Sequence, residues 1–487
     1  REAVEDFAKE TADGGPAVLI GVPWKDGDKL YNAMALLDEG EIQTLRYKVD
    51  LPNYGVFDEK RVFAPGPLPG PVNFRGVRIG VPICEDIWTE EVCECLEETA
   101  SEILLVPNGS PYHIDKQDIR LNIVVARITE TGLPMVYANM VGGQDELVFD
   151  GTSFVLNSDS SLALQMPEFD EAIAVSHWTR TDDGWRAEPG AMAERDEGEE
   201  EIYRACVLGL RDYVNKNHFK SVVLGLSGGI DSALCAAMAV DALGADRVHC
   251  VMMPYKYTSS ASLDDAAACA DALGVKYDIV PIADPVEGFT VSLADMFAET
   301  QPDTTEENIQ SRARGTILMA ISNKFGPMVV TTGNKSEVSV GYATLYGDMN
   351  GGFNPIKDLY KMQVYALSSW RNTAKPNGAL GPDGIVIPEN IITKAPSAEL
   401  REDQTDQDSL PPYDVLDDIL ISLVEKEMGI KDIVARGHDE VTVRRIEHLL
   451  YVAEYKRRQA APGVRVTEKN FGRDRRYPIT NGFRDRT

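Results

Sequence analysis

The sequence lacks any apolar run long enough to cross a membrane, and it lacks the CxxC pairs that bind zinc or cycle between thiol and disulfide. Its seven cysteines are scattered, and only Cys93 and Cys95 lie close together. Scattered cysteines without an evident disulfide framework are typical of a reducing compartment. We therefore expect a cytoplasmic protein with no membrane partner.

Basic residues are also scarce, because 48 Lys and Arg face 78 Asp and Glu, for a formal net charge of -30. Nucleic acids are bound through basic surfaces, so this balance argues against a nucleic acid as main partner. It does not exclude a small anionic ligand, because a local basic pocket can exist on an acidic protein. At 487 residues the chain is too long for one ordinary core, and we expect two or three domains.

The first part of the chain, up to about residue 180, is dense in short apolar segments. One of them is VRIGVPI at 77–83, and helical patterns at 89–100 and 116–132 fall between others. These features predict an α/β domain with mixed strand pairing. The polar and acidic stretch at 178–201 is typical of a linker.

Beyond residue 202 strands and helices alternate regularly. Such alternation is typical of a doubly wound parallel sheet, whose ligands bind at the carboxyl ends of the strands. After residue 381 a Pro-rich, acidic segment predicts an irregular arm or lid, followed by helices to about Gln459. We expect helices at 202–217, 232–243, 262–273 and 307–325, and strands at 221–226, 248–254, 276–282 and 328–332.

The stretch LGLSGGIDS at 224–232 is a turn between one of these strands and the next helix. Glycines let an anion approach the unpaired N–H groups of a helix start, so a phosphate is the natural ligand. The carboxylate of Asp231 would need a cation between itself and phosphates, which predicts Mg²⁺. The GxxxxGK[ST] phosphate loop is excluded by the spacing and the missing lysine. A plain helix start capped by Ser227 remains the simpler alternative.

The SGGIDS loop resembles the pyrophosphate-binding loop of the ATP pyrophosphatases, which activate a carbonyl as its adenylate. Three further segments resemble NAD synthetases in the same order: the helix start ENIQSRAR, TTGNKSE with the following YGD, and PSAELREDQTDQDSLPPYD. This resemblance covers nearly all of residues 202–487. It implies a fold like that of adenine-nucleotide hydrolases, with ATP and deamido-NAD as substrates and Mg²⁺ as the metal.

The resemblance also implies roles for individual residues. Asp231 and Glu337 would bind the metal, and Asp348 is left open between a turn residue and a functional one. Asn308, Glu337 and Lys469 would contact deamido-NAD. The residues that would contact ATP are Gly225, Leu226, Ser227, Gly228, Gly229, Ile230, Asp231, Ser232, Thr332 and Lys361.

Cys84 follows the apolar strand of the first part, where a thiolate at a strand end can meet a substrate. A lone cysteine there is most often a small buried hydrophobe. However, ICEDIW around Cys84 and KVDLPNYGVFDE around Lys48 resemble the nitrilase-type glutaminase domain of glutamine-dependent NAD synthetases. The resemblance implies that Cys84 is the nucleophile and that Lys48, with Glu59 as a partner, stabilises the oxyanion. The implied glutamine-binding residues are Tyr54, Ser110 and Lys116.

One element of that family pattern is missing. The general-base glutamate belongs to a PE-containing segment followed by a GY turn, and no glutamate near the start of this sequence has that context. We expect either that the chain lacks about one βα unit of the domain or that its glutaminase is inactive. No catalytic glutamate is therefore named.

These observations predict an amidotransferase with two domains. We expect an N-terminally incomplete nitrilase-like αββα glutaminase at 1–180, a linker at 181–201, and the synthetase at 202–487. The family further implies internal passage of ammonia and a homo-oligomer, a synthetase-domain dimer or larger. GMP or asparagine synthetase are enzymatic alternatives, but they carry other glutaminase domains. The remaining alternative is an ammonia-dependent synthetase whose nitrilase-like domain is catalytically inactive and only binds to the synthetase domain.

Overall fold

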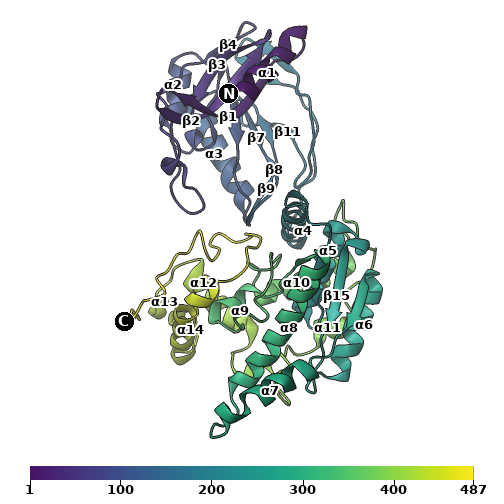
Figure 1. The fold of residues 1–487 in the computed structure, drawn as a ribbon. Coiled ribbons are helices and arrows are strands. Elements are labelled where there is room, and N and C mark those ends of the chain that lie inside the picture. The colour runs from purple at the N-terminus through teal and green to yellow at the C-terminus, as the bar shows by residue number, and fades with distance from the viewer. Residues whose placement is uncertain (486–487) are drawn as a thin grey trace. The chain divides into compact units, whose positions relative to one another are not determined.

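The computed structural model describes residues 1–485 and divides into two compact units (Figure 1). The first unit comprises Arg1–Gly142 and Phe149–Arg195, and the second comprises Gly143–Val148 and the chain from Asp196 onward. Among residues 1–485, no helix combines the length and the apolar character that a membrane crossing requires.

Two sheets face each other in the first unit. A three-stranded antiparallel sheet has the order β1-β2-β3, and a mixed six-stranded sheet has the order β11-β10-β7-β6-β5-β4. The first sheet contains β1 (Val18–Asp26), β2 (Lys29–Asp38) and β3 (Glu41–Tyr47). The second contains β4 (Val72–Phe74), β5 (Val77–Gly80), β6 (Ile103–Asn108), β7 (Met135–Asn139), β10 (Phe154–Leu156) and β11 (Leu162–Gln165).

The alternation of side chains along β2 explains the layering. Ala33, Ala35 and Leu37 pack with α1 (Glu2–Glu10), while Met34 and Leu36 pack with the β4 and β5 region of the second sheet. The opposite face of the second sheet packs against α2 (Glu91–Glu98) and α3 (Lys116–Thr131). The order helix, sheet, sheet, helix confirms the predicted αββα fold.

Two further strand pairs, β8 with β9 and β12 with β13, lie outside these two sheets. The turn between β8 (Val141–Gln144) and β9 (Leu147–Asp150) belongs to the second unit, where the Gly143 N–H donates to Asp212 Oδ2 at 2.7 Å. The stretch interpreted as a linker contains the hairpin of β12 (Trp178–Thr181) and β13 (Gly184–Ala187).

A four-stranded parallel sheet with the order β16-β15-β14-β17 forms the centre of the second unit. Helices cover both of its faces: α7 and α8 pack on one, while α5 packs on the other together with α4 and α10. This confirms the predicted doubly wound sheet. The strands are β14 (Val222–Gly225), β15 (Val248–Met252), β16 (Lys276–Ile279) and β17 (Met328–Val329), and the helices are α4 (Glu199–Lys216), α5 (Ile230–Leu243), α6 (Ser260–Leu273), α7 (Ala283–Phe297), α8 (Thr304–Phe325) and α10 (Lys361–Thr373).

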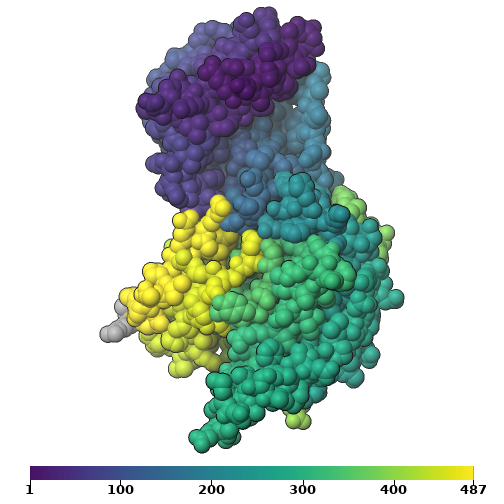
Figure 2. All heavy atoms as spheres, in the orientation of Figure 1, coloured from purple at the N-terminus to yellow at the C-terminus, as the bar shows by residue number. Residues whose placement is uncertain are grey.

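The C-terminal helices form a second core around Leu416, Ile446 and Val340, the last of which belongs to α9. The short helix α9 (Lys335–Val340) thus lies between this core and the end of β17. Figure 2 shows the C-terminal segment, in yellow, at the surface of the second unit. The remaining helices are α11 (Glu389–Thr393), α12 (Tyr413–Val424), α13 (Ile430–Ala435), α14 (Glu440–Val452) and α15 (Glu454–Arg457).

Candidate active sites

The glycine loop of the second unit runs from the end of β14 at Gly225 to the start of α5 at Ile230. Two serine hydroxyls hold its shape. Ser227 Oγ accepts from the Gly229 N–H at 3.3 Å, and Ser232 Oγ lies 2.9 Å from the Gly229 carbonyl oxygen and 3.1 Å from Ser227 Oγ. These contacts fix the turn between β14 and α5 that the sequence predicted.

Gly228 is the position in this loop that tolerates no side chain. Its φ is +79°, and a Cβ there would lie 2.3 Å from the Ser262 carbonyl oxygen at the start of α6. The absence of a side chain thus lets the loop pack directly on the α6 backbone.

Gly228→Ala is expected to lower the free energy of unfolding by more than about 1 kcal/mol, because the left-handed conformation alone costs alanine about 1–2 kcal/mol. Gly229→Ala is the matched comparison: its φ is −92°, and the nearest atom to its Cβ, Ser227 Oγ, is 3.3 Å away. Calorimetric melting of both variants measures the difference. Equal destabilisation by the two alanines would contradict the role of Gly228.

The glycine loop opens into a cavity of about 330 Å³. Its lining includes the loop, residues 330–333 after β17, part of α8, and residues between 391 and 406. Of the residues that the sequence predicted for ATP, metal and deamido-NAD, the structure brings ten to this cavity. They are Gly225, Leu226, Ser227, Gly229, Ile230, Asp231, Ser232, Thr332, Glu337 and Lys361.

The other three predicted residues, Gly228, Asn308 and Lys469, are not among the lining residues. Asn308 Oδ1 accepts a hydrogen bond from the Thr344 hydroxyl at 2.9 Å. The Lys469 ammonium pairs with Glu427 at 3.0 Å, and the Lys469 N–H donates to Glu425 at 2.9 Å. Asp348, which the sequence left open, does line the cavity.

Two carboxylates and one ammonium meet at the start of α5. Lys361 Nζ lies 2.5 Å from Asp231 Oδ2 and 3.1 Å from Glu337 Oε1, and its side chain is buried. Burial raises the pKa of the Glu337 carboxyl, and the Lys361 charge opposes that shift. Although burial opposes it, the pKa of Lys361 is raised by Asp231 and Glu337, so this group is a permanent cation.

This donor set fits Mg²⁺. Asp231 and Glu337 both line the cavity, and carboxylate oxygens are the protein ligands that Mg²⁺ prefers. Within residues 1–485, no group of three or more His, Cys, Asp or Glu side chains converges on a common point. A metal here would therefore take most of its ligands from substrate phosphates and water, as Mg²⁺ does in nucleotide sites.

Lys394 is a cavity residue that the sequence did not reveal. Its Nζ lies 3.0 Å from the Gly228 carbonyl oxygen, 3.1 Å from Ser262 Oγ and 2.9 Å from Asp265 Oδ2. It belongs to the segment that the sequence interpreted only as an arm or lid. The available signal was a lysine within an acidic, Pro-rich segment of a protein that has few basic residues.

In the first unit, Cys84 begins a single 3₁₀ turn (Cys84–Ile87) after β5 and has a φ of 50°. A positive φ is uncommon for a residue with a side chain, and such strain clusters at functional sites. Burial raises the pKa of the Cys84 thiol, while the Lys48 charge and a hydrogen bond from the Gly109 backbone lower it. Burial outweighs these two effects, so the pKa of the Cys84 thiol is raised overall, and the Lys48 charge opposes this shift by favouring the thiolate.

Lys48 itself is buried, and its Nζ lies 2.7 Å from Glu59 Oε1. The structure therefore places Glu59 where the sequence expected a partner for Lys48. The sequence missed Asp86, whose carboxylate accepts from the Val49 and Asp50 N–H groups at 3.0 and 2.7 Å and from the Ile83 N–H at 2.9 Å. This one carboxylate ties the segment after Lys48 to the residue before Cys84, and its only sequence signal was the CED triplet.

The three predicted glutamine-binding residues make different contacts. The Tyr54 hydroxyl donates to Glu85 Oε1 at 2.7 Å, and burial, followed by this hydrogen bond, raises the pKa of Tyr54. Lys116 Nζ lies 4.5 Å from the centre of the Trp88 ring. Ser110 is buried, and its hydroxyl accepts from Arg120 Nε at 3.1 Å.

Two family models match the chain: carbon-nitrogen hydrolase over residues 1–182 and NAD synthase over residues 202–460. The glutamine-dependent NAD(+) synthetase of Rhodobacter capsulatus is 53% identical over 485 residues, covering 100% of this chain and 88% of that protein. The same enzyme of Xanthomonas campestris pv. campestris is 48% identical over 486 residues, with coverages of 97% and 85%.

A solved structure gives the same result. The glutamine-dependent NAD+ synthetase of Acinetobacter baumannii, determined in complex with ADP, superposes with a TM-score of 0.76 at 43% sequence identity. The comparison covers 99% of this chain and 87% of that one.

Proposed function

The chain belongs to the glutamine-dependent NAD(+) synthetases, and on this premise we propose how its own residues perform the reaction. It is a ligase that forms a C–N bond with glutamine as nitrogen donor. ATP activates the carboxylate of deamido-NAD as an adenylate, and ammonia released from glutamine converts the adenylate to NAD. AMP, pyrophosphate and glutamate are the other products.

The observation that carries the adenylation proposal is the meeting of Asp231, Glu337 and Lys361 beside the glycine loop. A carboxylate oxygen of deamido-NAD attacks the α-phosphorus of ATP, and the bond from that phosphorus to the pyrophosphate oxygen breaks. The N–H groups at the start of α5, together with Lys361 and Lys394, stabilise the negative charge that develops on pyrophosphate.

Asp231 and Glu337 would hold Mg²⁺, which supplies further positive charge to the phosphate oxygens. Thr332, at the end of β17, is assigned to ATP because it lines the same cavity. Asn308 and Lys469 stay proposed contacts for deamido-NAD, a ligand larger than ATP.

In the second half-reaction the ammonia lone pair attacks the adenylate carbonyl carbon, AMP leaves, and the nitrogen loses a proton.

The glutaminase proposal rests on Cys84 and Lys48. The Cys84 sulfur attacks the side-chain amide carbon of glutamine, the C–N bond breaks, and ammonia leaves with an added proton. Water then hydrolyses the thioester to glutamate and restores the thiol. The Lys48 charge favours the thiolate and stabilises the oxyanion of the tetrahedral intermediate. Tyr54, Ser110 and Lys116 are proposed to bind glutamine.

Glutamine labelled with ¹⁵N in its side-chain amide tests the whole proposal. Incubation with ATP, Mg²⁺ and deamido-NAD is expected to place the label in the carboxamide of NAD, which mass spectrometry detects. Unlabelled ammonium salt added in a parallel reaction measures synthesis that bypasses glutamine. NAD formed from ammonium but not from glutamine would favour the alternative of an inactive docking domain.

Three further assignments are proposals. We propose functional boundaries at 1–180 for the glutaminase, 181–201 for the linker and 202–487 for the synthetase. The seven free thiols support a reducing, cytoplasmic environment. A homo-oligomer built on the second unit is supported by exposed apolar side chains on α7, Phe289 and Met296, which lie on one helix face. Sedimentation velocity of the whole chain measures the oligomeric state.

A further inference from the structure

Lys335 lies in the chain between Asn334 and Glu337, which contact Asp231 and Lys361. The Lys335 ammonium does not contact Asp231 or Lys361 in the described structure, but binds Glu425, Thr467 and the Lys469 carbonyl. Asn334, before it, donates a side-chain hydrogen bond to Asp231 at 2.8 Å, and Glu337, after it, contacts Lys361. The Lys335 side chain itself is completely buried and is not among the residues that line the cavity. A buried charge of this kind requires compensating partners.

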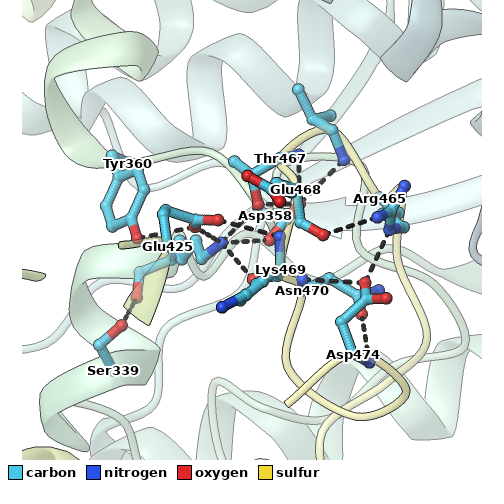
Figure 3. A network of polar contacts seen from close by, with 12 residues as sticks. Ser339, Asp358, Tyr360, Glu425, Arg465, Thr467, Glu468, Lys469, Asn470 and Asp474 are labelled. Carbon is cyan, nitrogen blue, oxygen red and sulfur yellow. Dashed lines mark hydrogen bonds and ion pairs between the residues drawn. The ribbon is translucent and has the colours of Figure 1, made fainter. Parts of the chain in front are cut away.

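Those partners come from three distant segments. Lys335 Nζ donates to Glu425 Oε1 at 2.5 Å, to Thr467 Oγ1 at 2.6 Å and to the Lys469 carbonyl oxygen at 2.9 Å, and it forms an ion pair with Asp358 Oδ1 at 2.8 Å. All three N–H bonds of the ammonium are thus used. Figure 3 shows Asp358, Glu425 and Thr467 converging on this point.

The same two carboxylates hold the C-terminal segment 465–470. Asp358 Oδ2 accepts from the Val466 and Thr467 N–H groups at 2.9 and 2.7 Å, and Glu425 Oε2 accepts from the Lys469 N–H at 2.9 Å. Although burial opposes it, the Lys335 charge and these backbone N–H groups lower the pKa of Asp358. The ammonium therefore joins this segment to α9 by neutralising the anions that bind its backbone.

The helix α9, which carries Glu337, depends on contacts with other segments. The helix α9 has only six residues, too few to be stable without tertiary contacts. Its first residues are held from outside: the Lys335 N–H donates to the Leu359 carbonyl at 2.8 Å, and Ser336 Oγ accepts from the Lys361 N–H at 2.9 Å. Asn334 Oδ1 caps the helix by accepting from the Glu337 N–H at 3.0 Å.

We propose that Lys335 is a positioning residue for adenylation: its ammonium fixes segment 465–470 against α9 and thereby keeps Asn334 in contact with Asp231 and Glu337 in contact with Lys361. The C-terminal segment is then a working part of the adenylation site. The inference rests on the proposed function of Asp231 and Glu337. A purely structural role would stabilise the fold without affecting how the site binds its metal.

Thr467→Val is the mildest test, because it removes one hydroxyl from the network and leaves every charge in place. Loss of one hydrogen bond is expected to raise the Mg²⁺ concentration for half-maximal ammonia-driven NAD synthesis about three- to tenfold. Glutamine hydrolysis should stay at the wild-type rate. Lys335→Met should show the same pattern with a larger shift, and Lys276→Met, at an exposed ion pair with Asp278, is the control.

Hydrogen exchange without metal or nucleotide supplies a readout independent of activity. In Thr467→Val, the backbone amide exchange rates of residues 334–340 and 464–470 are expected to increase together, by about tenfold, because the lost hydrogen bond limits the opening of both segments. Faster exchange in 464–470 alone, with a wild-type Mg²⁺ dependence, would overturn the proposal. If Lys335→Met does not fold, Thr467→Val decides by itself.

Asp231→Asn separates this inference from the proposed function. If Asp231→Asn leaves NAD synthesis intact, the assignment of the adenylation site itself is wrong. If Asp231→Asn abolishes synthesis while Thr467→Val matches the wild type in both measurements, only the role of Lys335 is refuted.

Discussion

Cys84→Ala is expected to abolish glutamine-driven NAD synthesis while leaving ammonia-driven synthesis at the wild-type rate. In the proposed mechanism Cys84 is the group that forms the thioester with glutamine. Removing such a nucleophile lowers the rate of glutamine hydrolysis by at least about 10³-fold. The two rates are measured by NAD formation with saturating glutamine or with ammonium salt. Because the second unit contains the complete adenylation cavity, ammonia added from solution should restore the product.

Cys95→Ala is the matched control for this experiment. Cys95 is a second partly exposed thiol of the first unit, located on α2, with its Sγ 3.7 Å from the Pro69 carbonyl oxygen. It has no lysine partner in the described contacts, and the substitution should change neither rate. Glutamine use that survives Cys84→Ala would refute Cys84 as the nucleophile.

Asp231→Asn is expected to lower the rate of NAD synthesis from both nitrogen donors by about 10²- to 10⁴-fold, because the proposed Mg²⁺ site would lose one of its two carboxylates and adenylate formation would slow. Release of pyrophosphate from ATP in the presence of deamido-NAD is the direct measurement. Glutamine hydrolysis by Cys84 is expected to continue, since its residues lie in the first unit. The opposite pattern, with pyrophosphate release intact, would remove Asp231 from the metal site.

The stability of this variant must be measured beside its activity. Asp231 is one of two carboxylates that neutralise the buried Lys361, so its replacement leaves the ammonium with Glu337 alone. Asp278→Asn is the control, because Asp278 is half exposed and pairs with His249 and Lys276 at the surface. If the Asp231→Asn protein is folded and hydrolyses glutamine normally, its loss of NAD synthesis is due to the adenylation step and not to unfolding.

The regular elements of the second unit were predictable because short apolar strand segments alternate with helix-forming stretches along the chain. The expected helix at 232–243 corresponds to α5, and all four expected strands are present although shorter. The helix α7 was missed although Val286, Phe289, Leu293 and Met296 recur at helical spacing, and of its residues only Val286 is buried. The CED triplet was the only signal for Asp86, and it did not indicate that this carboxylate would join the Lys48 segment to the Cys84 turn.

Sequence alone determined the local features: the bend at Gly228, the start of α5 with Asp231, and the strand end that carries Cys84. These depend on residues that are neighbours in the chain, so short-range sterics and helix-end electrostatics suffice to predict them. Only the tertiary structure decided that Lys361 lies between Asp231 and Glu337, that Lys394 reaches the glycine loop, and that Lys469 joins a network behind α9. The partners in those contacts are far apart in sequence, 130 residues in the case of Lys361 and Asp231, and only packing of the whole unit brings them together.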